Sequence, residues 1–238
     1  AFADGVQVSS DGLLTLDATT GGMNGAGALG LNANRGVTIN DRLTTAGPLD
    51  INSDTDAATG GNLTVAAGVT VSGGANAVNV TANDVALSGT LAGGALTITD
   101  SDGSGAGLGS TPVSRGVNIS QSELQNISAT TFQLDTPGPM MVDNIGAADS
   151  ENVNAVILSS DGTITFLNNP STFDSLTVLA DNGVAVNTDV STDTGNLAMD
   201  GDANNTADGL DSIAFADGVQ VSSAGLLTLD ATTGGMNG

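Results

Sequence analysis

The start of the chain returns almost unchanged at its C-terminal end. Residues 1–25 read AFADGVQVSSDGLLTLDATTGGMNG, and residues 214–238 differ from them only by Ala224 in place of Asp11. Residues 1 and 214 are equivalent, so the repeat length is 213 residues. A sequence that restarts itself is typical of a tandem array and not of a closed domain. We therefore predict one repeat unit over residues 1–213 and the start of the next identical repeat over residues 214–238.

A shorter pattern lies inside this unit. The segments 29–48, 78–95 and 176–196 each contain an alternating strand, a polar corner, a second strand and a Gly-rich or polar turn, over roughly 20 residues. Alternation places apolar and polar side chains on opposite faces of each strand. It predicts an inner face with Leu29, Leu31, Val37 and Ile39 and an outer face with Asn32, Thr38 and Asn40.

Such short strands bury their apolar faces only when successive circuits stack on one another. Crossovers between parallel strands are right-handed in nearly all cases. The predicted fold is therefore all-β, an open-ended right-handed parallel β-helix, or solenoid. The choice of acidic residues supports an all-β fold with many turns. Of the 26 acidic residues, 24 are Asp and only Glu123 and Glu151 are Glu, and Asp favours turns over helices.

The charge narrows the choice of partners. The net charge is −23, and the only cations are Arg35, Arg42 and Arg115. This balance argues against binding to nucleic acids or to anionic membrane surfaces. Hard cations such as Ca²⁺ suit so many carboxylates. No apolar run is long enough for a membrane span, and the lack of Cys is compatible with a secreted chain.

The side-chain inventory argues against an enzyme. The chain has no His, Cys or Lys, which removes Ser-His and Cys-His nucleophile pairs and lysine bases. Paired Asp residues can cleave glycosides, but the chain has no Trp or Tyr to hold a sugar ring. A polysaccharide-active β-helix enzyme is the remote alternative. Phe2 and Phe215 are the same repeat position, and we expect both to fill the core.

An acidic segment, DGDANNTADGLD over residues 200–211, is the candidate metal site. Oxygen-bearing side chains occupy positions 1, 3, 5, 7, 9 and 12 of a calcium-loop spacing, namely Asp200, Asp202, Asn204, Thr206, Asp208 and Asp211. Asn205 replaces the usual glycine at position 6, and Asp211 replaces the usual glutamate at position 12. Calcium is the only cofactor that the sequence suggests. The alternative is a solvated acidic turn.

Other polar motifs favour turns and exposed faces. We expect Asp50, Asn52, Asp54 and Asp56 to project outward, and Asp100 and Asp102 to form a turn with Gly103. Gly25, Gly27 and Gly30 match a dinucleotide-binding spacing, but a strand pattern follows where a helix is required. Residues 101–116 read as a surface loop. Over residues 120–128 an irregular corner is favoured over a helical turn capped by Ser120 and Glu123.

Several segments together resemble a known family. Residues 25–45, 105–128, 171–202 and 211–235 are similar to the repeat regions of filamentous-haemagglutinin-like giant bacterial surface proteins. The resemblance covers most of the chain. It implies a right-handed β-helix that is exported to the cell surface and serves as a fibre, stalk or adhesin.

The expected function is therefore structural: a repeat of an extracellular or cell-surface filament whose circuits stack along the fibre axis. Its expected partners are further copies of the repeat end to end, with lateral bundling of like fibres as a second possibility. The alternative is an adhesin shaft in which an exposed face or the 101–116 loop binds glycans or surfaces.

Overall fold

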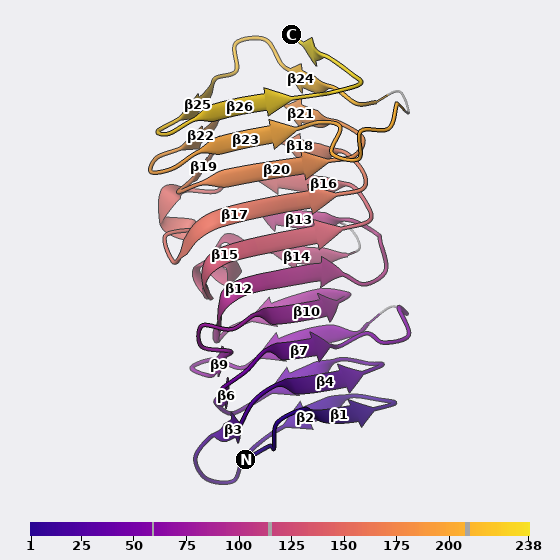
Figure 1. Ribbon diagram of the computed structural model, residues 1–238, viewed down its shortest axis with the longest axis vertical. Helices are drawn as coiled ribbons and strands as arrows, with labels where there is room; N and C mark the ends of the chain where they lie inside the picture. Colours follow the sequence, from indigo (N-terminus) through magenta and orange to yellow (C-terminus); the bar gives the residue numbers. More distant parts are fainter. Residues whose placement is uncertain (59, 114–115, 208–209) are drawn as a thin grey trace. The chain divides into compact units, whose positions relative to one another are not determined.

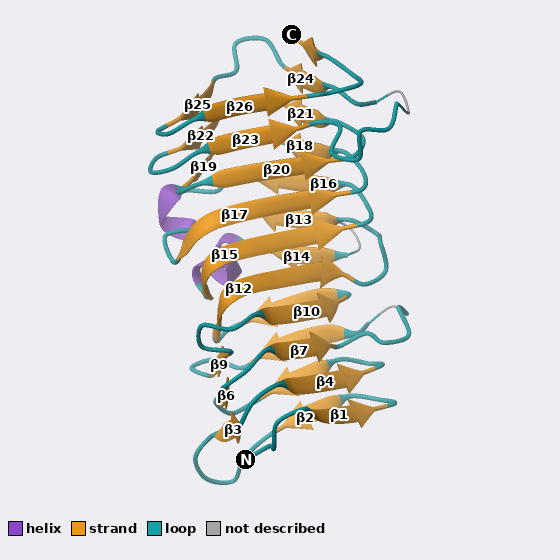
Figure 2. Cartoon of the chain, in the orientation of Figure 1, coloured by secondary structure: helices purple, strands orange, loops and turns teal. Residues whose placement is uncertain are grey.

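The computed structural model describes residues 1–58, 60–113, 116–207 and 210–238. The chain forms two compact units. Unit 1 comprises Ala1–Asp102 and Asn126–Phe132, and unit 2 comprises Gly103–Gln125 and Gln133–Gly238. Short strands dominate both units (Figure 2), and the pairings within each unit are parallel. The predicted all-β class with parallel sheets is thus confirmed.

Unit 1 distributes its strands over three series that the chain visits in turn (Figure 1). The first series is β1 (Val6–Ser10), β4 (Leu29–Ala33), β7 (Leu49–Asn52), β10 (Val78–Ala82) and β12 (Thr90–Asp100). The second is β2 (Leu14–Leu16), β5 (Val37–Ile39), β8 (Asn62–Val65) and β11 (Asp84–Leu87). The third is β3 (Met23–Gly25), β6 (Leu43–Thr45) and β9 (Thr70–Ser72), which pairs with the start of β12. We call three consecutive strands, one from each series, a triplet.

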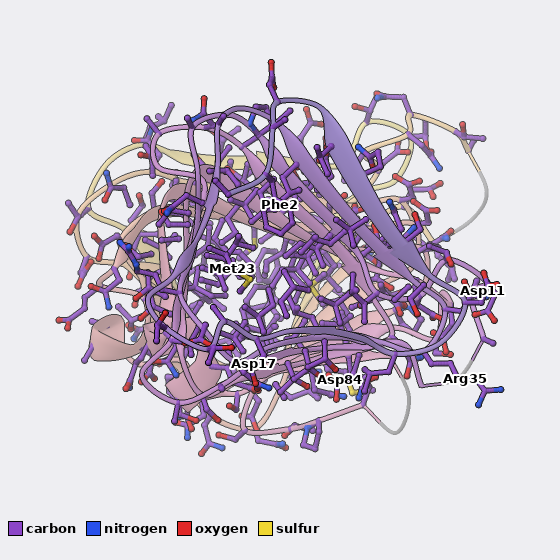
Figure 3. All side chains as sticks on the ribbon, turned by 90° about the horizontal axis from the view of Figure 1, so that it is seen from below. Phe2, Asp11, Asp17, Met23, Arg35 and Asp84 are labelled. Carbon is purple, nitrogen blue, oxygen red and sulfur yellow. The ribbon has the colours of Figure 1, made fainter. Side chains whose placement is uncertain are left out.

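The register of these pairings stacks apolar side chains. Leu31 lies beside Val8 on one neighbouring strand and beside Ile51 on the other. Leu29, Leu31, Val37 and Ile39 are at most 1% exposed, whereas Asn32 and Thr38 are half-buried and Asn40 is exposed. The predicted inner and outer faces are therefore confirmed. Seen from the N-terminal side, Phe2 and Met23 lie within the outline of the ribbon, and Asp11 and Arg35 lie at its edge (Figure 3).

Unit 2 repeats this arrangement. One series contains β17 (Val153–Ser160), β20 (Leu176–Ala180), β23 (Leu197–Asp200) and β26 (Leu227–Asp230). Another contains β14 (Val117–Ile119), β13 (Ala106–Gly109), β16 (Met140–Asp143), β18 (Ile164–Phe166), β21 (Val184–Val186), β24 (Ile213–Phe215) and β27 (Met236–Asn237). The third contains β19 (Ser171–Phe173), β22 (Val190–Thr192) and β25 (Val221–Ser223). Strand β15 (Ile127–Thr136) contributes its first residues to unit 1 and its last to unit 2.

Unit 2 contains the short helices of the described chain, and one of them corrects a prediction. Residues 121–125 form helix α1 (Gln121–Gln125), and Ala147–Asp149 form the 3-10 helix η1. The Glu123 carboxylate accepts the Ser120 backbone N–H at 2.9 Å, and Ser120 Oγ accepts the Glu123 N–H at 3.3 Å. This reciprocal capping starts the helix, so the favoured irregular corner over residues 120–128 was wrong. Leu124, fully buried, anchors α1 to the core.

Two further expectations need correction. The 101–116 segment is not entirely a loop, because β13 lies inside it and pairs with β14 and β16. Phe2 and Phe215 are only half-buried, whereas Phe132, Phe166 and Phe173 are fully buried. Phe2 forms an isolated bridge with Gly25, and Phe215, at the end of β24, pairs with Val186 on one side while β27 pairs with Ile213 and Ala214 on the other.

Candidate functional site

The acidic segment 200–211 begins where β23 ends. Asp200 is the last residue of β23, and its Oδ1 accepts the Asp202 backbone N–H at 3.0 Å. Asn205 adopts a left-handed backbone with φ of 54°, which asparagine tolerates well, and its N–H donates to the Asp202 carbonyl. These local bonds turn the chain away from the strand and hold the Asp202 side chain at the corner.

The structure separates the predicted metal ligands into two groups. Asp202 and Asp211 are 0% and 5% exposed. Asn204 and Thr206 are exposed, and Asn204 Oδ1 accepts the Thr206 N–H at 2.8 Å instead of turning inward. Asp208 lies outside the described residues. Among the described residues, no three acidic groups are placed to share one metal ion.

Both buried carboxylates bind the same residue, Thr233. Asp202 Oδ2 accepts the Thr233 backbone N–H at 2.6 Å, and Asp211 Oδ2 accepts the Thr233 hydroxyl at 3.0 Å. Thr233 belongs to the turn between β26 and β27, within the second copy of the repeated segment. Sequence analysis missed this residue. The available signal was the turn-forming motif Thr-Thr-Gly-Gly itself, which β24, β25 and β26 separate in sequence from the acidic segment 200–211.

The corresponding turn of the first copy has a different partner. Its residues are Thr19, Thr20, Gly21 and Gly22, and the Ala18 N–H just before it donates to Asp41 Oδ2 at 2.7 Å. Gly21 has a φ of +76°, and a Cβ added there would have no neighbour within 4 Å. Its counterpart Gly234 lies so close to Asp211 that an added Cβ would stand 1.7 Å from the Asp211 carbonyl oxygen. Only the second turn is therefore pressed against two carboxylates.

A second acidic corner, in unit 1, contradicts the expectation of a solvated face. Asp50 and Asp56 are exposed, but Asp54 is 2% exposed. Asp54 Oδ2 accepts the Ser101 hydroxyl at 2.5 Å, and Asp54 N–H donates to Asn52 Oδ1. Burial, together with the neighbouring Asp56 carboxylate, raises the pKa of Asp54. The loop that carries Ser101 covers this corner, which alternation within one strand could not reveal.

The end of β12 also differs from the expected turn. Asp100 is the last residue of the strand and is 2% exposed, so the turn begins after it. Asp102 Oδ2 accepts the Asn83 side-chain amide at 2.9 Å. Gly103 then adopts a φ of +68°, which favours glycine. The predicted turn exists, but Asp100 stands outside it.

Asp143, at the end of β16, was not singled out by sequence analysis. It is 2% exposed. Burial by itself raises the pKa of Asp143, but hydrogen bonds from the Thr111 hydroxyl and from the backbone and side chain of Asn169 outweigh it and lower the pKa. This carboxylate ties the segment after β13 to the corner after β18.

The glycine motif has no phosphate-binding context. Gly25 ends β3, and Gly30 lies within β4, so no helix begins where the motif would need one. A Cβ on Gly30 would overlap the Gln7 side chain, and one on Gly27 would overlap Asp4. Close packing between neighbouring triplets explains both glycines.

Comparison with known proteins finds no family model, no curated protein and no solved structure that matches the chain. Within the described residues, no helix has the length and apolar character needed to cross a membrane.

Proposed function

We propose that the chain is a structural repeat of an extracellular or cell-surface filament, built as a right-handed parallel β-helix whose circuits continue from one copy to the next. Each triplet of strands corresponds to one circuit. In both units most strands pair with the strand of the same series in the next triplet, which is how a coil of stacked circuits is held together. The right hand follows from the strong preference of parallel crossovers.

The observation that carries the proposal is the register by which apolar positions of the second copy stack on buried apolar positions of the preceding strands. Leu227 pairs with Leu197, and Met236 pairs with Ile213. Leu197 and Ile213 are 0% exposed, but Leu227 and Met236 are 39% and 58% exposed. The strands of the second copy therefore extend the same stacks of parallel strands instead of forming a separate fold, as a coil that continues between copies requires.

The distribution of residue types fits a structural shaft better than a protein with a binding or catalytic site. The fully buried side chains are overwhelmingly Val, Leu, Ile and Phe, and the outward positions of the strands are mostly Thr, Asn, Ser and Asp. A net charge of −23 repels like fibres from one another. Lateral bundling would therefore require cations, whereas end-to-end stacking of circuits would not.

A series of proteins that carry residues 1–213 once, twice, three and four times in tandem tests the proposal. Each circuit adds roughly 4.8 Å along the axis, so about ten to eleven circuits should lengthen the particle by roughly 50 Å per copy. Electron microscopy of the purified series measures this increment. Thermal unfolding should also shift upward from one copy to two, because each added interface stabilises its neighbours.

The proposal fails if particle length does not grow with copy number, or if the copies behave as independent beads joined by flexible linkers. A matched control inserts a Gly-Ser linker between copies. The linker should abolish the upward shift in unfolding temperature without altering the composition of each repeat.

A further inference from the structure

We propose that Asp202 and Asp211 bind a Ca²⁺ ion at the corner after β23, with the Thr233 hydroxyl as a third oxygen, and so fasten the turn of the second copy. This inference goes beyond the proposed function and does not rest on it, because the two carboxylates and Thr233 lie together whether or not the chain forms filaments.

The first step is convergence. The two carboxylates come from opposite ends of the acidic segment, yet each has one oxygen on Thr233, at 2.6 Å from its nitrogen and 3.0 Å from its hydroxyl. The two carboxyl groups therefore converge on one residue, Thr233. The close approach of Gly234 to the Asp211 backbone fixes the turn there. The oxygens are thus held before any ion arrives.

The second step concerns a buried carboxylate oxygen that lacks a hydrogen bond among the described residues. Asp202 is 0% exposed, and among the described residues its Oδ1 has no hydrogen-bond partner, although the other oxygen of the same carboxyl accepts from Thr233. A buried carboxylate oxygen without a partner is costly, and an adjacent buried carboxylate makes it more so. A cation bound between the two groups removes both penalties at once.

The third step concerns the source of positive charge. Arg35 and Arg42 belong to unit 1, and the only cationic side chain in the sequence of unit 2 is Arg115, outside the described residues. Carboxylate and hydroxyl oxygens on an irregular corner favour Ca²⁺, which accepts irregular geometry, over Mg²⁺, which requires a near-ideal octahedron. The expected ion is therefore Ca²⁺.

The test measures Ca²⁺ binding to the 238-residue chain by isothermal titration calorimetry, in 150 mM KCl at pH 7 after removal of metal with EGTA. We compare the unaltered chain with Asp202→Asn, Asp211→Asn and Thr233→Val. The matched control is Asp11→Asn, which removes the same charge from an exposed position in unit 1. The expected result is one saturable site, weakened at least tenfold by either Asp202→Asn or Asp211→Asn and less than twofold by Asp11→Asn.

A second measurement uses only the unaltered chain, so it does not depend on whether a variant folds. Ca²⁺ should slow hydrogen exchange of the Thr233 amide at least tenfold relative to EGTA, and it should raise the unfolding temperature. Equal loss of affinity in Asp11→Asn and Asp202→Asn would show a diffuse ion atmosphere and overturn the proposal. Unchanged Thr233 exchange would also overturn it, as would an Asp202→Asn chain that is more stable and equally responsive to Ca²⁺.

Discussion

Val178 offers a direct test of the buried core. It lies in the middle of β20, beside Leu158 on one neighbouring strand and Met199 on the other, and is 0% exposed. Val178→Asp replaces an apolar side chain by a carboxyl among apolar neighbours. The lost burial costs about 1.5–3 kcal/mol. Keeping the new carboxyl protonated at pH 7, about three pH units above the usual pKa of Asp, costs about 4 kcal/mol more.

The pH dependence of unfolding separates the effect of the new charge in Val178→Asp from the effect of the changed side-chain shape. Burial raises the folded-state pKa of the new carboxyl above its unfolded value, so the penalty grows as pH rises from the unfolded pKa toward the folded one. The asparagine of Val178→Asn has nearly the same shape as the aspartate of Val178→Asp, but it does not titrate. Relative to Val178→Asn, the aspartate should cost up to about 4 kcal/mol more at pH 7 and almost nothing more at pH 4.

Urea unfolding followed by far-ultraviolet circular dichroism at both pH values measures these differences. Thr177→Asp is the matched control, because Thr177 is the outward neighbour and is half-buried. It should cost at most about 1 kcal/mol. The reasoning is refuted if Val178→Asp and Thr177→Asp unfold at the same urea concentration, or if the difference between Val178→Asp and Val178→Asn does not change with pH.

Three further predictions concern polar corners. Because burial raises the pKa of Asp54, its contribution to stability is present below the unfolded pKa and is lost as pH rises through the folded value. Asp54→Asn should therefore raise the unfolding temperature at pH 7, with a gain that fades toward pH 4; a lower temperature at pH 7 would contradict this. The contribution of Asp143 to stability has the opposite pH dependence. Because its pKa is lowered in the folded state, Asp143 is stabilising above the unfolded pKa, and this contribution is lost as pH falls through the folded pKa. Asp143→Ala should cost about 2–4 kcal/mol at pH 7 in urea unfolding, because several charge-assisted hydrogen bonds are lost; a cost that persists undiminished at pH 2 would argue against the charge. Glu123→Ala removes half of the capping pair of α1 and should cost about 1 kcal/mol. It should also speed amide exchange within residues 121–125 alone; exchange that speeds equally in β20 would refute a local role.

Local sequence patterns predicted the class of the fold because alternation and turn residues act over a few positions. The inward side chains of β4 and β5 follow directly from the alternation of Leu29, Leu31, Val37 and Ile39 with polar residues. The prediction over residues 120–128 went wrong for a related reason. Ser120 and Glu123 have the spacing of a capping pair, but the segment has few apolar residues, and these gave no sign that Leu124 would be buried.

The acidic corners needed the tertiary structure. Asp54 is covered by Ser101, and Asp202 and Asp211 meet at Thr233, all through contacts between distant parts of the sequence. Nothing in the spacing of Asp50, Asn52, Asp54 and Asp56 distinguishes the buried member from the exposed ones. Its burial depends on the path of a loop that belongs to another triplet.

The repeated segment shows most clearly which features follow from the sequence and which follow from the tertiary structure. By itself the sequence determined where strands and turns occur, since both copies form a strand over the Leu-Thr-Leu motif and a turn at Thr-Thr-Gly-Gly. Only the tertiary structure decided the partners: Leu14–Leu16 pairs with β5 in the second series of unit 1, whereas Leu227–Asp230 pairs with β23 in the series of unit 2 that contains β17. The physical reason is that alternation specifies which side chains turn inward, while backbone hydrogen bonds between parallel strands are the same for any neighbour with the same alternation.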